Sequence, residues 1–201
     1  QRILYVHLGG NGQTTHVAHD RAIKHPVLQH LRSNHWVRYL GVSYQDTCSH
    51  ADLVETAYQS VIEQIAQIQV HPSIPLPVFL FGYSLGGNVA MHVAARLKKE
   101  RPQLALTVLT QNAPKSGAAP VMALMSQLIA SVPLVFKPLA YFFALYGVSV
   151  LANWLMPLAP CVDDVECLSI NNHQDKLIKE PIVGHRTIYV SPEENSTSLS
   201  T

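Results

Sequence analysis

A strand-like run that leads through a glycine-rich turn into a helix-like run is the strongest constraint in this chain. Residues 77–83 are rich in β-branched and aromatic side chains, and residues 88–99 have the character of a helix. Between them stands the pattern Gly82-x-Ser84-x-Gly86. Glycines at both positions remove side chains that would collide with the neighbouring strand and helix, so the serine can take a strained turn with its hydroxyl exposed. The alternative is a loop that only connects strand to helix.

The segment Phe-Gly-Tyr-Ser-Leu-Gly-Gly-Asn-Val-Ala, residues 81–90, resembles the nucleophile elbow of α/β-hydrolase lipases and esterases. The resemblance implies a mostly parallel sheet with helices on both faces, and a serine hydrolase that needs no metal or organic cofactor. Ser84 matches the nucleophile, at the positive end of the following helix, which favours a developing oxyanion. The N–H of Leu85, the next residue, would be one donor of the oxyanion hole.

A second glycine-rich loop follows the first expected strand, residues 3–7. His7-Leu8-Gly9 resembles the His-Gly-x loop that supplies the other oxyanion-hole donor in this superfamily, with Leu8 where the family usually has glycine. Gly9 is therefore the expected donor. A plain glycine-rich turn is the alternative.

The other expected elements alternate along the chain. Helices are predicted over residues 14–34 and 51–70, and strands over residues 36–44, 104–110, 165–170 and 186–191. Residues 1–115 and 163–201 would form the α/β-hydrolase core. The first strands and the final helix of the usual core have no counterpart, so the core is expected to be incomplete at both ends.

The acid of a catalytic triad is expected after the strand at 165–170. Residues 171–178 resemble the superfamily loop that carries this acid, and Asp175 is the residue that matches. It would hold the catalytic imidazole in the right tautomer. The alternative is an ordinary carboxylate in a turn.

The base is not identified by the sequence. The superfamily places its histidine after the last strand, where residues 192–201 contain none. His185 has the expected order after Asp175 but precedes the last strand, which predicts a place at the opposite edge of the sheet, and His173 lies beside Asp175. Three interpretations stay open: a base beyond Thr201, which is favoured, His185 after a local rearrangement, or a hydrolase fold without activity.

Residues 116–162 contain a single charged side chain, Lys137, and five prolines. Residues 139–156 form an apolar run of a length that can span a bilayer, and a buried core helix is a second interpretation. The prolines instead favour several short helices that form a cap over the serine. The position agrees, because the superfamily inserts its cap between the sixth and seventh strands. Such an apolar cap indicates an acyl-chain or lipid substrate, with contact to a membrane surface rather than a span.

The net charge, the cysteines and the histidines argue against nucleic-acid binding, a disulfide framework and a metal site. The net charge of +1 gives no electrostatic reason to expect nucleic acid as a partner. The cysteines fit neither a disulfide framework nor a zinc pattern, which favours a reducing compartment, cytoplasmic or at the periphery of a membrane, with secretion left open. Five histidines are expected on the solvated surface and not at a metal, because only one acid, Asp20, lies near them. They are His16, His19, His25, His30 and His35.

The sequence therefore predicts a serine esterase or lipase that cleaves an acyl ester or thioester through an acyl-enzyme on Ser84. A peptidase or an acyltransferase on the same fold is one alternative. The other is a membrane- or partner-binding module on an inactive hydrolase fold, in which residues 116–162 are the working part.

Overall fold

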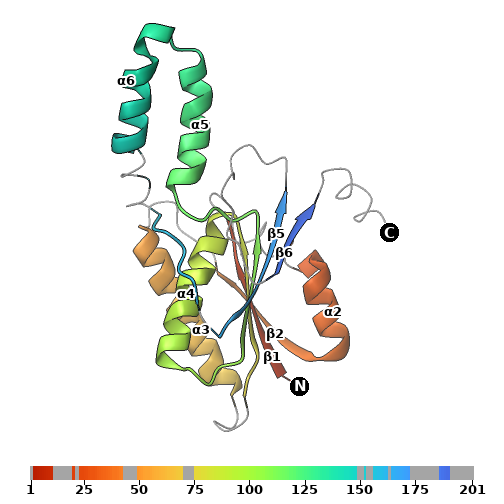
Figure 1. Cartoon of the computed structure of the whole chain (residues 1–201). Coiled ribbons are helices and arrows are strands. Elements are labelled where there is room, and N and C mark those ends of the chain that lie inside the picture. Colours follow the sequence, from red (N-terminus) through yellow and green to blue (C-terminus); the bar gives the residue numbers. More distant parts are fainter. Residues whose placement is uncertain are drawn as a thin grey trace.

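In a computed structural model, the chain folds into a parallel sheet with helices on both faces (Figure 1). The structure describes residues 2–10, 20, 23–42, 49–69, 75–148, 152, 156–162, 164–172 and 186–190. The described strands are β1 (Arg2–Leu8), β2 (Trp36–Val42), β3 (Val78–Tyr83), β4 (Leu106–Gln111), β5 (Glu166–Asn172) and β6 (Arg186–Val190). The described helices are α2 (Pro26–Asn34), α3 (His50–Ile68), α4 (Leu85–Glu100), α5 (Ala118–Ala130), η1 (Leu134–Phe136), α6 (Lys137–Phe142) and η2 (Phe143–Val148). The predicted fold class is confirmed.

The strand order defines where a ligand site can form. The order is β2-β1-β3-β4-β5-β6, and every pairing is parallel. The chain thus runs from β1 out to β2, crosses back over β1 to β3, and continues away on the other side. In open α/β sheets, ligands bind outside the carboxyl ends of the strands at the point where the order reverses. That point lies between β1 and β3, where Leu8 pairs with Gly82.

Two hydrophobic cores fix the helices to the sheet. Successive side chains of a strand point to opposite faces, so Leu4 and Val6 of β1 lie in the core beneath α3 and α4. Tyr5 lies in the smaller core, with Phe81 of β3 and Leu28 of α2. Both faces of β1 are therefore buried, as is usual in a sheet covered by helices on both sides.

The helix expected over residues 14–34 is interrupted, and α2 begins at Pro26. His25 is its extended N-cap residue, with φ −67° and ψ 127°. Proline disfavours helical angles in the residue before it and lacks an N–H, so it suits the first position of a helix and not an interior one. Residues 11–19 and 21–22 lie outside the described part of the chain.

His25 is also not a solvated surface residue, contrary to the expectation. Its ring lies 4.5 Å from the ring of Phe81, and burial lowers its pKa. His30 is exposed, while His16 and His19 are outside the described residues. Within the described ranges, no group of three or more His, Cys, Asp or Glu side chains is arranged to hold a metal ion.

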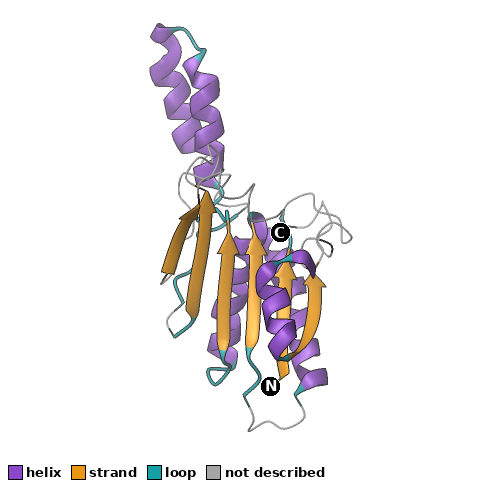
Figure 2. Ribbon diagram, turned by 90° about the vertical axis from the view of Figure 1, so that its right-hand side faces the viewer, coloured by secondary structure: helices purple, strands orange, loops and turns teal. Residues whose placement is uncertain are grey.

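Residues 118–148 form a helical hairpin, here called the arm, which stands clear of the carboxyl edge of the sheet (Figures 1 and 2). Helix α5 packs against α6 and η2, and among the described side chains of the hairpin Ile129 of α5 and Ala144 of η2 are buried. Prolines begin the short helices, because Pro133 is the N-cap of η1 and Pro138 lies in the first turn of α6. Among the described residues, no helix has the length and apolar character needed to cross a membrane. The division into core and cap stays a prediction.

The root of the arm, which here means Lys115 before it and residues 157–159 after it, is tied to α4 by Asn88, which is fully buried. Its Nδ2 donates to the main-chain carbonyls of Lys115 (3.2 Å) and Pro157 (3.0 Å), and its Oδ1 lies 2.8 Å from Nε2 of His50. The two sides of the root are also joined directly, since the N–H of Ala159 donates to the carbonyl of Lys115 at 2.8 Å. One amide side chain thus joins Lys115, which precedes the arm, and Pro157, which follows it, to the helix after Ser84.

Acidification is expected to destabilise the fold through histidines at this root. The rings of His50 and His92 lie 5.0 Å apart, and burial lowers the pKa of both. An unfolded chain protonates its histidines near pH 6.5, whereas the folded chain does so only at lower pH. Between the lowered pKa of the folded state and about pH 6.5, the unfolded state therefore binds more protons than the folded state. The free energy of unfolding thus has its full value above about pH 6.5 and falls as the pH decreases below it. The midpoint of thermal unfolding should be lower at about pH 5.5 than at about pH 7.5.

A matched variant isolates this effect. His50→Gln keeps an N–H donor for Asn88 but cannot be protonated, so its loss of stability on acidification should be smaller. Side-chain hydrogen bonds lower the pKa of Glu55 and Glu100, so these carboxylates titrate below about pH 4.5 and do not contribute in the same window. An unchanged pH profile in His50→Gln would exclude this histidine as the source.

Candidate active site

Ser84 connects β3 to α4 in a strained conformation, with φ 52° and ψ −123°. A positive φ is unfavourable for a residue with a Cβ, and this ψ lies outside the left-handed helical region. Hydrogen bonds hold the residue from both sides: its N–H donates to the carbonyl of Gln111 (3.0 Å), and its carbonyl accepts from the N–H of Gly87 (3.0 Å). The half-buried side chain makes no capping hydrogen bond to α4, so its hydroxyl is left for other chemistry.

The glycines around Ser84 are explained by close backbone contacts. A Cβ on Gly82 would lie 2.4 Å from the carbonyl oxygen of Gly86, and a Cβ on Gly87 would lie 2.2 Å from Cβ of Ala113. Real Cβ atoms do not approach other atoms so closely, so neither position accepts a side chain. The strand, turn and helix of this segment match the geometry that the glycine pattern predicts.

The loop after β1 lies directly against this turn. A Cβ on Gly86 would lie 2.1 Å from the carbonyl oxygen of Leu8 and 2.4 Å from that of Gly9, and a Cβ on Gly10 would lie 3.2 Å from Cβ of Ser84. Gly9 therefore lies beside the first turn of α4, where the N–H of Leu85 has no partner within the helix. The structure brings together Gly9, Ser84 and Leu85, which the sequence assigns to one site.

Leu8 stands where the superfamily usually has glycine, and the structure shows how the fold accommodates it. Leu8 is the last residue of β1 and its side chain is fully buried in the larger core. The leucine therefore contributes to packing, and the loop that approaches the elbow begins only at Gly9.

The proposed acid and base, Asp175, His173 and His185, lie outside the described residues, so their roles stay predictions. The flanking strand β5 ends at Asn172, two residues beyond Ile170. Because Ile170 is aligned with the last residues of β4 and β3, the chain leaves β5 at the edge of the sheet that carries Ser84.

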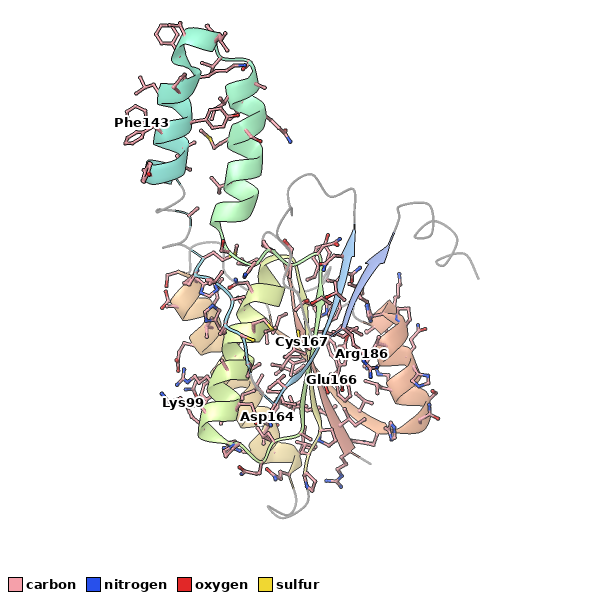
Figure 3. All side chains as sticks on the ribbon, viewed as in Figure 1. Lys99, Phe143, Asp164, Glu166, Cys167 and Arg186 are labelled. Carbon is pink, nitrogen blue, oxygen red and sulfur yellow. The ribbon has the colours of Figure 1, made fainter. Side chains whose placement is uncertain are left out.

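Strand β6 begins at Arg186, and His185 before it lies outside the described residues, so the place of His185 at the opposite edge of the sheet stays a prediction. Register aligns Arg186 through Leu168 and Leu109 with Phe81, the fourth residue of β3. Arg186 is nevertheless separated from Phe81 by three strand spacings, which is about 14 Å. By contrast, Asp164 precedes β5 at the end of the sheet away from the arm, as Figure 3 shows.

The polar cluster beneath the arm, formed by Asn88, His92 and His50, was not predicted from the sequence. Asn88 and His92 are four residues apart and share one face of α4, and His50 comes from the start of α3. The available signal in the sequence was the presence of two polar residues, four positions apart, on a helix whose other buried residues are apolar. Their partners are distant in sequence and could be found only from the tertiary structure.

Comparison with known proteins places the chain in a family. The sequence profile described as thioesterase domain matches residues 25–128, just over half of the chain, from the start of α2 through the elbow to α5. No curated protein matches the sequence significantly.

Solved structures share the fold at low sequence identity. An α/β hydrolase from Vibrio vulnificus is 17% identical with a TM-score of 0.57, over 94% of this chain and 65% of that one. Carboxyl esterase 2 from the fungus Tuber melanosporum is 13% identical with a TM-score of 0.56, over 94% and 66%. VinJ is 15% identical with a TM-score of 0.51, over 99% and 88%. The chain thus spans about two thirds of the length of the first two.

The structural likeness establishes the fold, and the sequence match establishes the family and its esterase or thioesterase class of hydrolase. With its six parallel strands and the strained turn at Ser84, this α/β-hydrolase chain belongs to the thioesterase-domain family.

Proposed function

We propose that this chain hydrolyses an acyl thioester or ester through a covalent acyl-enzyme on Ser84. The observation that carries the proposal is the strained φ of Ser84, held by main-chain hydrogen bonds beside Gly9 and Leu85. A non-glycine residue in such a conformation costs about 1–3 kcal/mol and persists where the surrounding structure enforces it, which is typical of active sites.

Each residue has a defined role in the proposed reaction. The Oγ of Ser84 attacks the acyl carbonyl carbon while a histidine takes its proton, and the carbonyl oxygen becomes an oxyanion. The N–H groups of Gly9 and Leu85 and the positive end of α4 stabilise this oxyanion. The bond to the leaving thiol or alcohol then breaks, and the leaving group takes the proton from the histidine. Asp175 is the proposed partner that orients the imidazole.

Water completes the proposed cycle. The same histidine accepts a proton from water, the hydroxide oxygen attacks the acyl carbon, and the second oxyanion collapses with release of the carboxylic acid. The proton returns to the Oγ of Ser84, which restores the enzyme. No step requires a metal or an organic cofactor.

The proposed substrate carries an acyl chain. Two observations support this class: the family profile is that of thioesterases, and the apolar arm stands at the same edge of the sheet as Ser84. Turnover should therefore rise from short to long acyl thioesters, and exceed turnover of peptide amides with matching acyl groups. A preference for the amides would favour a peptidase, and transfer to an added alcohol an acyltransferase.

Labelling with a fluorophosphonate tests the assignment of the nucleophile. This probe reacts with a serine that a base and an oxyanion hole activate, and mass spectrometry locates the adduct. We expect the adduct on Ser84 and none on the exposed Ser33 or Ser131, which serve as internal controls. Loss of labelling in His185→Gln but not in His173→Gln would identify the base as His185. An adduct at another serine would contradict the proposal.

A further inference from the structure

The arm exposes large apolar side chains at its tip and along one side of α6 and η2. The tip is η1 (Leu134–Phe136), where Leu134 is 82% and Val135 is 77% exposed. The outer stripe consists of four side chains that are 57% to 62% exposed: Leu139, Phe142, Phe143 and Tyr146. Their spacing of i, i+3, i+4 and i+7 normally marks the face that a helix turns to a core. Here the stripe faces away from α5, as Phe143 shows in Figure 3.

Charge and composition point to lipid as the material that covers these side chains. Residues 116–162 contain no acidic side chain, and their one charge, Lys137, lies between the tip and the outer stripe. Protein interfaces surround an apolar centre with a polar rim, whereas the arm has a single charged side chain and no acidic one. A lone cation beside exposed apolar and aromatic groups instead complements the anionic headgroups and the interfacial region of a bilayer.

The shape of the exposed surface supports the same conclusion. The tip points along the hairpin, whereas the outer stripe lies along its flank, where the ring of Phe142 is 4.8 Å from that of Tyr146 and 6.2 Å from that of Phe143. A flat protein partner would cover the flank and leave the tip in water. A fluid phase that the hairpin enters covers both.

We propose that the arm inserts its tip and outer stripe into the surface of a lipid bilayer, with anionic headgroups beside Lys137. Insertion of this kind is interfacial and does not span the membrane. Figure 2 shows the strands pointing toward the end of the molecule at which the arm stands, so the edge that carries Ser84 would face the bilayer. This docking is independent of the proposed chemistry, and Ser84→Ala should bind vesicles as well as the original chain.

Flotation with vesicles tests the proposal directly. The full chain is mixed with vesicles of phosphatidylcholine alone, or of phosphatidylcholine with phosphatidylglycerol, and floated on a density gradient. We expect the protein to float with both, and more completely with the anionic vesicles. The double variant Leu134→Asp/Val135→Asp should lower the partition coefficient at least about a hundredfold, because two inserted apolar side chains become charged.

Two further variants distinguish insertion of apolar side chains from electrostatic attraction to the headgroups and from non-specific adsorption of exposed apolar groups. Lys137→Gln should lower binding about fivefold on anionic vesicles only. Trp36→Ser removes a large side chain that is 54% exposed in β2, outside the arm, and should not change flotation. Leu134, Val135 and Trp36 are exposed and Lys137 is only half-buried, so the unfolding midpoints of these variants should stay close to that of the original chain.

Three results would overturn the proposal. One is a chain that floats with neither kind of vesicle, and another is a double variant that floats as well as the original. The third is a concentration-dependent dimer in analytical ultracentrifugation that the double variant abolishes, without vesicle binding by either protein. That result would assign the tip and outer stripe to a second copy of this chain.

Discussion

Replacing Ser84 by alanine is expected to lower kcat for an acyl thioester by at least about 10⁴-fold, with little change in KM. The substitution removes only the Oγ, which in the proposed mechanism forms the covalent bond to the acyl group in the transition state. An interaction made only there contributes to kcat and not to ground-state binding. Stability should hardly change, because the hydroxyl makes no capping hydrogen bond to α4. Steady-state kinetics and thermal unfolding measure the two effects.

The controls for this experiment come from the same chain. Ser33→Ala removes an exposed hydroxyl from α2, on a face of the sheet away from α4, and should keep full turnover. Ser84→Cys retains a nucleophile at the turn and should keep measurable thioester cleavage with a shifted pH profile. Turnover of Ser84→Ala within tenfold of the original chain would show that the nucleophile lies elsewhere.

Gly86→Ala is expected to have the largest effect on stability, a loss of about 3 kcal/mol or more in the free energy of unfolding. The new Cβ would lie 2.1 Å from the carbonyl oxygen of Leu8 and 2.4 Å from that of Gly9. Both atoms belong to the backbone, so they cannot move aside as the end of a side chain can. The loop after β1 must shift, which also separates Gly9 from Ser84 and should lower turnover in the molecules that still fold. Urea unfolding and single-turnover acylation measure the two losses.

A matched glycine provides the comparison. A Cβ on Gly147 in η2 would meet nothing within 4 Å, so Gly147→Ala should change stability by less than about 1 kcal/mol. If Gly86→Ala does not fold, Gly10→Ala offers a milder version, since its nearest contacts are side-chain atoms at 3.1 and 3.2 Å. Equal stability of the Gly86 and Gly147 variants would contradict the close contact between the loop and the elbow.

The central part of the fold and site could be predicted because its signals are local. The apolar run of β3, the glycines and the helix that follows are contiguous, so the strained turn at Ser84 could be expected from about ten residues. The break before Pro26 also has a local cause in the proline itself, but the helix expected over residues 14–34 ran through that position. The place of Gly9 followed from a family resemblance and not from any pattern near Ser84.

The remaining features depend on contacts between distant residues. The register of β6 is set by pairing with β5, so the level of Arg186 could not be derived from its own sequence. His25 gave no sign of its packing on Phe81, because that contact exists only after α2 docks on the sheet. In the same way, the sequence around Asn88 gives no sign of its bonds to Lys115 and Pro157, which lie on either side of the arm.

The two bonds that Asn88 donates through Nδ2 reach main-chain carbonyls and not side chains, and this has evolutionary implications. The carbonyls of Lys115 and Pro157 are present whatever amino acids replace these two residues, and the bond from Ala159 to Lys115 is also between main-chain atoms. A hairpin of different length or polarity could therefore be exchanged at this root without altering the core. In this sense the arm is an exchangeable insertion: its length and polarity could change while the contacts around the strained turn at Ser84 stay the same.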